Sequence, residues 1–292
     1  MPSVADYKLD RCGDWFLWTL EGARDVAMQR SAIALVERQP ASKHPQTVRL
    51  SWPAESSGQR FFLKAFHRGR GASKAKDLFR ASMARRFWRQ GLMLAAAGFD
   101  VPLTVAFAEK RRGGVVQRSF VLTEALSGLP APQYLSDLDI AQHSRAHLKM
   151  KRDAIAQLGA LIRRFHDLGF VHGDLVASNI LVVTRNPDRL SFYFMDNDRT
   201  RRYLPWLTGK LRKRNLVQLS RLPLAHITLQ DRLRFLHAYL GAVRLTKRDR
   251  RFARWLEART RQRRNECDGM DPNGSFRKLM RWVPDTTSAQ NG

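Results

Sequence analysis

The sequence predicts an α+β fold of two lobes, a small β-rich lobe followed by a mainly helical one. Short β-rich segments alternate with turn-forming residues up to about residue 66. Turn signals then cluster at 127–132, where Ser-Gly is followed by two prolines. Beyond them, apolar residues recur at helical spacing over 155–165. We therefore assign residues 1–126 to a first lobe and 127–267 to a second.

The first lobe is expected to be an antiparallel sheet with one helix. Its first strands are predicted by WFLWTL, TVRLSW and RFFLKAF, at 15–20, 47–52 and 60–66. Helix formers run over 74–97 and end at Gly98 and Pro102, which predicts a helix. Two more strands are predicted at 103–108 and 115–123, joined by a turn with two glycines.

The second lobe is expected to be mostly helical, beginning with a helix that carries Ile155, Leu158, Ile162 and Phe165 on one face. Short apolar runs at 180–183 and 190–195 predict two strands that flank a loop. Two later segments with helical patterns are LQDRLRFLHAYL, at 229–240, and RRFARWLEARTRQRR, at 250–264. Residues 268–292 are predicted to form a flexible tail.

The charge of the chain indicates an anionic partner. Its 292 residues contain 52 Lys and Arg against 26 Asp and Glu, a net charge of +26. From Arg199 onward there are 23 basic and 7 acidic residues, so most of the excess lies in the last third. Nucleic acid, an acidic lipid surface and a phosphorylated substrate all fit this charge.

Cysteine content and hydropathy favour a chain of the reducing cytoplasm. Cys12 and Cys267 lie near opposite ends, which predicts neither a disulfide framework nor a zinc site. The longest uncharged apolar stretch, 91–99, is far shorter than the about 18 residues of a membrane span. We expect no signal peptide and no transmembrane helix, and peripheral membrane association stays open.

The most specific string runs from Val171 to Val183, VHGDLVASNILVV, where a helix, a polar turn and a β-run follow in order. Asp174 and Asn179 have the D-x-x-x-x-N spacing of a kinase catalytic loop. A carboxylate at the first position orients an attacking hydroxyl, and an amide oxygen at the second binds magnesium. The next strand delivers Asp196, where a kinase has a metal-binding aspartate.

These motifs resemble the protein-kinase-like fold and, within it, the lipopolysaccharide core sugar kinase family of Kdo and heptose kinases. Further support comes from FFLKAF with Lys64, from WRQGLMLAAAGFDVP at 88–102 and from the hinge-like VLTEAL at 121–126. The late pairing of RKRNLVQLSRL with RFLHAYL is also similar to the family. The resemblance covers roughly residues 55–245.

The resemblance implies an ATP- and Mg²⁺-dependent kinase. Lys64 would bind the α- and β-phosphates, and the backbone from Glu124 to Leu126 would contact adenine. Asn179 and Asp196 would hold the magnesium ion.

On the acceptor side, the resemblance implies that Asp174 orients a Kdo or heptose hydroxyl of the lipopolysaccharide inner core. The implied partners are the lipid A core acceptor and an anionic membrane surface, with nucleic acid not expected. The implied location is cytoplasmic, peripheral on the cytoplasmic face of the inner membrane.

Two departures from the kinase pattern favour an inactive member. No G-x-G-x-x-G precedes Lys64, and Gly58 is the only glycine in the loop before it. The helix that follows should supply a glutamate to orient Lys64, yet Phe87 stands at the expected position. The nearest upstream carboxylate is Asp77.

Two other functions stay open at this point. One is a small-molecule kinase of the aminoglycoside or choline type, which also uses HGD with a downstream Asn. The other is a non-catalytic kinase-like scaffold that binds anionic glycolipid or nucleic acid through its basic last third.

Several residues have a structural interpretation beside the functional one. His172 is expected to pack and to hold backbone rather than transfer protons. Asp198 is either a second metal ligand or, as we expect, a partner of Arg199, Arg201 or Arg202. A membrane interface is open for three tryptophans, although a buried position is expected for each: Trp206, Trp255 and Trp282.

Overall fold

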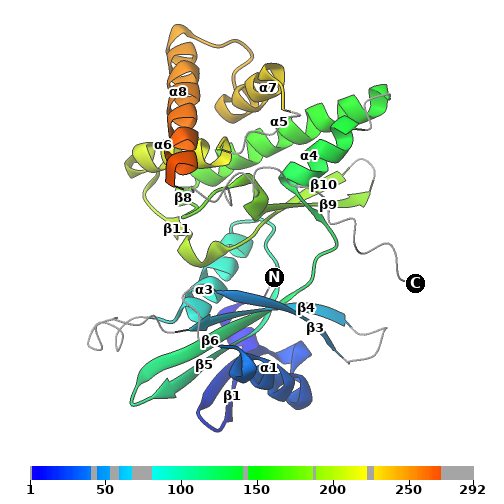
Figure 1. Cartoon of the computed structure of the whole chain (residues 1–292), viewed down its shortest axis with the longest axis vertical. Coiled ribbons are helices and arrows are strands. Elements are labelled where there is room, and N and C mark those ends of the chain that lie inside the picture. The colour runs from blue at the N-terminus through cyan, green and yellow to red at the C-terminus, as the bar shows by residue number, and fades with distance from the viewer. Residues whose placement is uncertain are drawn as a thin grey trace. The chain divides into compact units, whose positions relative to one another are not determined.

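The computed structural model describes residues 2–40, 45–52, 59–67, 81–140, 144–186, 189–221 and 227–270, and the chain divides into two compact units (Figure 1). The first unit comprises Met1–Ser127 together with Tyr193–Thr200. The second comprises Gly128–Phe192 and Arg201–Gly292. Residues 193–200 therefore group with the first unit, although the sequence analysis assigns them to the second lobe.

The first unit is built on a six-stranded sheet in which every neighbouring pair is antiparallel. The strand order is β1-β2-β5-β6-β4-β3. All five strands predicted for this region are present, and β1 is an additional one. The strands are β1 (Tyr7–Cys12), β2 (Trp15–Leu20), β3 (Gln46–Trp52), β4 (Gln59–His67), β5 (Thr104–Arg112) and β6 (Val115–Glu124).

The prediction of one helix in the first lobe is wrong, because the described residues of the first unit contain α1 (Val26–Arg38) and α3 (Met83–Ala96). α1 begins at Asp25, whose carboxylate accepts hydrogen bonds from two backbone N–H groups of the first turn. Its buried face carries Met28, Ala32 and Val36 at a spacing of four residues. α1 therefore lies within the region up to residue 66, for which the sequence analysis predicts strands alone.

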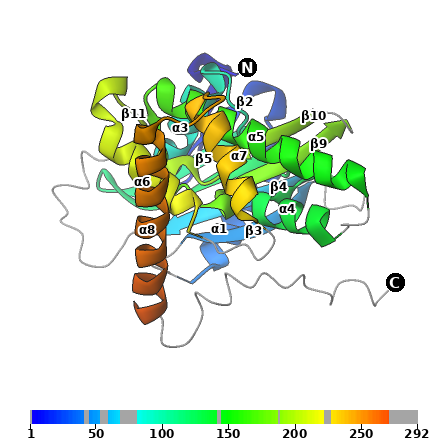
Figure 2. The same ribbon diagram turned by 90° about the horizontal axis from the view of Figure 1, so that it is seen from above.

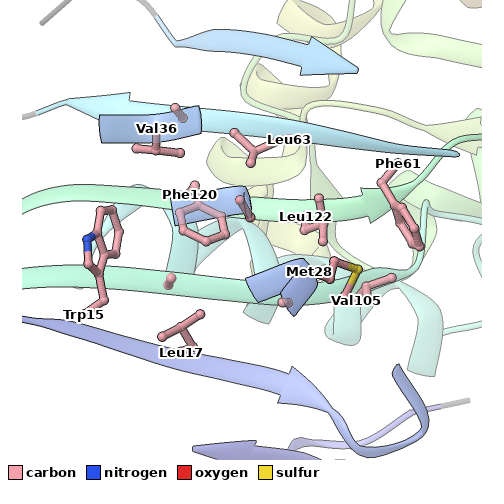
Figure 3. Close-up of a cluster of buried hydrophobic side chains, with 13 residues drawn as sticks. Trp15, Leu17, Met28, Val36, Phe61, Leu63, Val105, Phe120 and Leu122 are labelled. Carbon is pink, nitrogen blue, oxygen red and sulfur yellow. The ribbon is translucent and has the colours of Figure 1, made fainter. Parts of the chain in front are cut away.

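The two helices contact two different hydrophobic clusters of the sheet. Figure 3 shows the cluster at α1, where Val36 lies near Leu63 and Phe120, and Met28 lies near Leu122 and Val105. α3 contributes Phe87 and Trp88 to the other cluster. Because side chains alternate along a strand, Lys64 lies between Leu63 and Ala65 of the α1 cluster and points to the face of α3.

A buried carboxylate holds the start of α3. Glu109 of β5 is fully buried and accepts a 2.7 Å hydrogen bond from the hydroxyl of Ser82, the N-cap residue of α3. Arg85 and Arg111 form ion pairs with the same carboxylate at 3.3 and 2.6 Å. Two cations and a hydroxyl thus neutralise the buried charge and fix α3 on its sheet.

The second unit is mainly helical, as predicted, and carries short strands around the candidate catalytic loop. Its helices are α4 (Ala131–Ile140), α5 (Arg145–Asp167), α6 (Gly209–Leu219), α7 (Leu229–Leu240) and α8 (Lys247–Met270). Its strands are β7 (Leu129–Pro130), β8 (Phe170–Val171), β9 (Ile180–Asn186) and β11 (Arg201–Arg202), and β10 (Arg189–Phe194) runs on into the first unit.

α5 and α7 pack closely in the second unit (Figure 2). A Cβ atom at Gly159 of α5 would lie 2.6 Å from the carbonyl oxygen of Phe235 of α7, so the contact requires glycine there. The predicted helix 229–240 coincides with α7, and 250–264 lies inside α8. α8 extends to Met270, so residues 268–270 are helical rather than the start of a tail, and 271–292 lie outside the described residues.

The predicted burial of the tryptophans is wrong for Trp206, which is 76% exposed. Trp255 is also exposed, whereas Trp282 lies outside the described residues. Within the described ranges, the helices are all too short or too polar to be candidates for crossing a bilayer.

Candidate active site

The first unit brings together Lys64 and Asp196, which are 132 residues apart in the chain. The ammonium group of Lys64 forms an ion pair with Oδ1 of Asp196. The same ammonium lies 5.6 Å from the ring centroid of Phe66 and 6.0 Å from that of Phe87. Both distances are in the range of cation–π attraction, so two aromatic rings and a carboxylate position Lys64.

Phe87 lies where the sequence analysis expects a glutamate, and its ring does face Lys64. The lysine therefore obtains its carboxylate partner from Asp196 rather than from α3. Lys64 thus has a carboxylate partner although α3 supplies no glutamate. Gly58 and Asp77 lie outside the described residues.

Asp196 has an uncommon backbone conformation. With φ 54° and ψ 50°, it is the one non-glycine residue with positive φ in the described part of the chain. Aspartate tolerates this left-handed region better than most residues, but the conformation still costs free energy and recurs at functional sites. The segment is held by neighbours: Asn197 donates to the carbonyl of Phe194 at 2.8 Å, and the Phe194 N–H donates to the carbonyl of Asp100 at 2.9 Å.

Asp198 is a second, buried carboxylate beside Asp196. Burial, together with the charge of Asp196, raises the pKa of Asp198 to about 6. Nε of Arg199 lies 3.9 Å from Oδ2 of Asp198, so the expected arginine pairing is present as a long contact. Arg202, another expected partner, instead donates to the carbonyl of Leu168 at 3.1 Å.

The hinge-like segment follows β6, and two of its backbone N–H groups already donate hydrogen bonds within the first unit. The Glu124 N–H donates to the carbonyl of Leu103 at 3.0 Å, and the Ala125 N–H donates to the carbonyl of Arg60 at 2.9 Å. The Glu124 side chain accepts a 3.2 Å hydrogen bond from Gln59. Leu126, the other residue predicted here, is half-buried.

The second unit brings together Asp174 and Asn179. The Asn179 side-chain amide donates to the carbonyl oxygen of Asp174 at 2.9 Å. This bond engages the amide nitrogen, so Oδ1 is the atom that Asn179 can offer to a cation. The five-residue spacing recognised in the sequence thus corresponds to a closed turn, with both side chains half-buried.

A buried polar network holds this loop. His172 accepts a 3.1 Å hydrogen bond at Nδ1 from the N–H of Asp174. Asn215 of α6 accepts from the His172 N–H at 3.0 Å and donates to the His172 carbonyl at 2.6 Å. Asn215 donates also to Gln218 Oε1 at 3.1 Å. The contacts of His172 are therefore those of a residue that holds backbone.

His166 of α5 extends the network. Its Nε2 lies 3.3 Å from Asn215 Oδ1, and its Nδ1 lies 3.0 Å from the hydroxyl of Tyr239. Because Asn215 Oδ1 can only accept, Nε2 carries the proton and Nδ1 accepts from Tyr239. Burial lowers the pKa of His166 to about 4, so the neutral ring is the stable form.

The sequence analysis misses the residues that position the others. Asn215 and Gln218 lie three residues apart in the quoted string RKRNLVQLSRL, among apolar residues of α6. A polar pair at helical spacing beside buried Leu216 and Val217 is the signal that could have revealed them.

Comparison with known proteins identifies lipopolysaccharide kinases as relatives of this chain. The sequence profile of the "Lipopolysaccharide kinase (Kdo/WaaP) family" matches residues 37–239. The lipopolysaccharide core heptose(I) kinase WaaP of Escherichia coli (strain K12) is 27% identical over 200 residues, which cover 64% of this chain and 72% of that protein. The protein of the same name from Pseudomonas aeruginosa is 30% identical over 201 residues, covering 63% and 71%.

Among solved structures, "WaaP in complex with acyl carrier protein" matches with a TM-score of 0.56 at 20% sequence identity. The match covers 82% of this chain and 97% of that one. The predicted two-lobed, protein-kinase-like α+β fold is thereby confirmed.

Proposed function

The chain belongs to the lipopolysaccharide kinase (Kdo/WaaP) family and is therefore a phosphotransferase that acts on a sugar of the lipopolysaccharide core, and we propose that its acceptor is a heptose hydroxyl oriented by Asp174. The choice of heptose over Kdo follows the two curated relatives, both of which are heptose(I) kinases.

The observation that carries the proposal is the held catalytic loop. Asp174 is the carboxylate of the loop, and its backbone N–H donates to Nδ1 of His172, which Asn215 holds in turn. Such a carboxylate can orient a hydroxyl and take its proton as the bond to phosphorus forms. Phosphoryl transfer requires positioning and charge neutralisation from the protein, and the network supplies positioning.

Lys64 is the proposed phosphate-binding cation. Its ammonium group is held by Asp196 and two aromatic rings, so a nucleotide phosphate would find it already oriented. At the hinge-like segment, the Glu124 and Ala125 N–H groups are engaged. Adenine recognition would therefore use the carbonyl groups of this segment and the backbone at Leu126.

Asp196 of the first unit and Asn179 of the second are each proposed as magnesium ligands. Mg²⁺ is commonly bound through one or two protein oxygens together with substrate phosphates and water. The donors fit this chemistry, since the Asn179 amide presents Oδ1 and Asp196 is a carboxylate with a second carboxylate, Asp198, beside it. Burial, and then the charge of Asp196, raises the pKa of Asp198. When bound, the ion would neutralise charge on the transferred phosphoryl group.

We also propose that the protein works in the cytoplasm, peripherally on the inner membrane, where a lipid-linked core acceptor lies. The net charge of +26 supports this location, because an anionic leaflet attracts a basic surface. An acyl carrier protein is a further candidate partner, on the strength of the solved WaaP complex. Co-purification of the full chain with an acyl carrier protein would test that association.

The test of the function is transfer of labelled γ-phosphate from magnesium ATP to purified lipid A core acceptors. We expect acceptor-dependent labelling by the wild type and its loss in Asp174→Ala. A no-acceptor reaction is the control for self-labelling. Equal labelling by Asp174→Ala would overturn the assignment of Asp174, and no labelling with any core acceptor would overturn the proposed function.

A further inference from the structure

One surface of the second unit combines exposed aromatic and aliphatic side chains with basic ones. It is formed by residues 201–214, which run from β11 through the 3₁₀ turn Pro205–Leu207 into α6, and we call it the 201–214 surface. Trp206 is 76% exposed, Leu207 63% and Leu204 54%. Large apolar side chains exposed at neighbouring positions of the chain are typical of interaction surfaces.

The 201–214 surface is strongly basic, although Arg212 is paired with Asp167 of α5 at 3.1 Å. Residues 201–214 contain six basic side chains and no acidic one, and the sequence from 199 to 230 has no Asp or Glu at all. The basic residues are Arg201, Arg202, Lys210, Arg212, Lys213 and Arg214. A partner of this surface must therefore carry negative charge around an apolar region.

The backbone beneath the exposed side chains is held firmly. The Tyr203 N–H donates to the carbonyl of Gly169 at 2.9 Å, and a Cβ atom at Gly169 would lie 2.0 Å from the Tyr203 carbonyl oxygen. The hydroxyl of buried Thr208 donates to the carbonyl of Pro205 at 2.6 Å and accepts from Nε of Arg212 at 2.6 Å. Trp206 and Leu207 are thus presented to solvent by a fixed frame.

The 201–214 surface is joined to the candidate catalytic loop at both ends. β11 pairs with β8, with Arg201 opposite Val171, and the residue after β8 is His172. At the other end, α6 carries Asn215, which bonds the backbone of His172. Whatever binds the 201–214 surface is therefore held close to the loop that carries Asp174.

We propose that the 201–214 surface docks on an anionic lipid bilayer, with Trp206 and Leu207 entering the interfacial region and Lys210 and Arg214 contacting headgroups. Exposed tryptophan and leucine followed closely in the sequence by exposed lysine and arginine are the composition of segments that lie in a membrane interface. The inference deepens the proposed function and rests on it for its purpose, since it would bring Asp174 to the leaflet that holds a lipid-linked acceptor.

Flotation of the full chain with phosphatidylcholine vesicles, with and without phosphatidylglycerol, tests the proposal. We expect wild type to bind only the anionic vesicles, and Trp206→Ser with Leu207→Ser to weaken that binding about tenfold or more. The matched control is Leu9→Ser with Val26→Ser, which changes two comparably exposed residues of the first unit and should leave binding unchanged.

The basic residues are tested separately. Lys210→Ala with Arg214→Ala should weaken binding and make it less sensitive to salt, because fewer ionic contacts remain to be screened. Lys8→Ala with Arg89→Ala removes the same charge from exposed positions of the first unit and is the control. Equal binding by the wild type and both 201–214 variants would overturn the proposal.

A kinase assay separates failure of the surface from failure of the function. We expect the Trp206/Leu207 variant to phosphorylate a deacylated, soluble core acceptor normally and to lose activity on the same acceptor embedded in anionic vesicles. Equal activity of variant and wild type on the embedded acceptor would contradict the proposal. A wild type that binds vesicles but phosphorylates neither acceptor would overturn the proposed function and support the docking surface.

A protein partner is the alternative that these experiments exclude. If wild type failed to bind anionic vesicles while the 201–214 variants lost binding to an acidic protein, the surface would be a protein interface and the membrane proposal would be overturned. Circular dichroism of each variant verifies that its fold is retained.

Discussion

The two groups of candidate site residues are stabilised in different ways. Asn215, which holds the loop of Asp174, is fully buried, and its side chain makes hydrogen bonds with both its oxygen and its nitrogen. The side chain of Asp196, by contrast, is 41% exposed and pairs with Lys64 through charge, and the residue has a strained backbone conformation. A saturated buried network keeps one geometry, whereas a partly exposed ion pair can exchange its partner for a ligand. We therefore expect the loop to supply fixed positioning, and the Lys64–Asp196 pair to supply charges that can rearrange around a nucleotide.

The largest effect on activity is expected when the carboxylate of Asp174 is removed. Asp174→Asn keeps the backbone bond to His172 and should lower kcat by roughly 10³-fold, with little change in KM for ATP or in melting temperature. Steady-state transfer to a core acceptor measures this. Asp153→Asn, an exposed position on α5, is the control. A kcat within about twofold of wild type would show that Asp174 is not the group that orients the acceptor.

The next effect concerns the rigidity of the loop. Asn215→Leu leaves the buried N–H and carbonyl of His172 without their partner, so the free energy of unfolding should fall by about 2–4 kcal/mol and kcat should fall with it. Urea denaturation and kinetics measure the two quantities. Gln230→Leu, at an exposed position of α7, should change neither. Unchanged stability in Asn215→Leu would mean that the network does not hold the loop.

A pH effect of similar size is expected from His166. Its folded-state pKa is about 4 against an ordinary value of 6.5, so the unfolded chain binds more protons between these values. Stability from this group is therefore complete above about pH 6.5 and is lost as pH falls toward 4, by up to about 3 kcal/mol.

Urea titrations of wild type and His166→Gln between pH 4 and 7 measure this contribution as a difference. Carboxylates that titrate in the same range affect both proteins and cancel. The free energy of unfolding of wild type minus that of His166→Gln should decrease as the pH falls. A difference independent of pH would mean that His166 is not held neutral in the folded protein.

The smallest effect is expected at the Lys64–Asp196 pair, beside which the ring of Phe87 lies. Phe87→Leu removes an aromatic face 6.0 Å from the Lys64 ammonium and should raise KM for ATP about two- to fivefold, since a partly exposed cation–π contact contributes about 0.5–1 kcal/mol. Phe87→Tyr retains the ring and should keep KM near the wild-type value. If both variants shifted KM alike, packing rather than the aromatic face would position Lys64.

Several elements of the fold can be predicted from local sequence patterns. The segment 171–183, five strands of the sheet and α7 follow from contiguous residues, because strand alternation, helical periodicity and turn-forming residues act over a few positions. The same local patterns do not predict α1, since its four-residue spacing of buried residues lies between β-rich segments.

The amino-acid sequence alone determined the two-lobed α+β class and the catalytic-loop motif around Asp174 and Asn179. Only the tertiary structure decided that Lys64 pairs with Asp196 across 132 residues and that Asn215 holds His172 across 43. It also decided that Trp206 is exposed. The reason is physical: partner choice and burial depend on which distant segments pack together, and residue type by itself does not specify that packing.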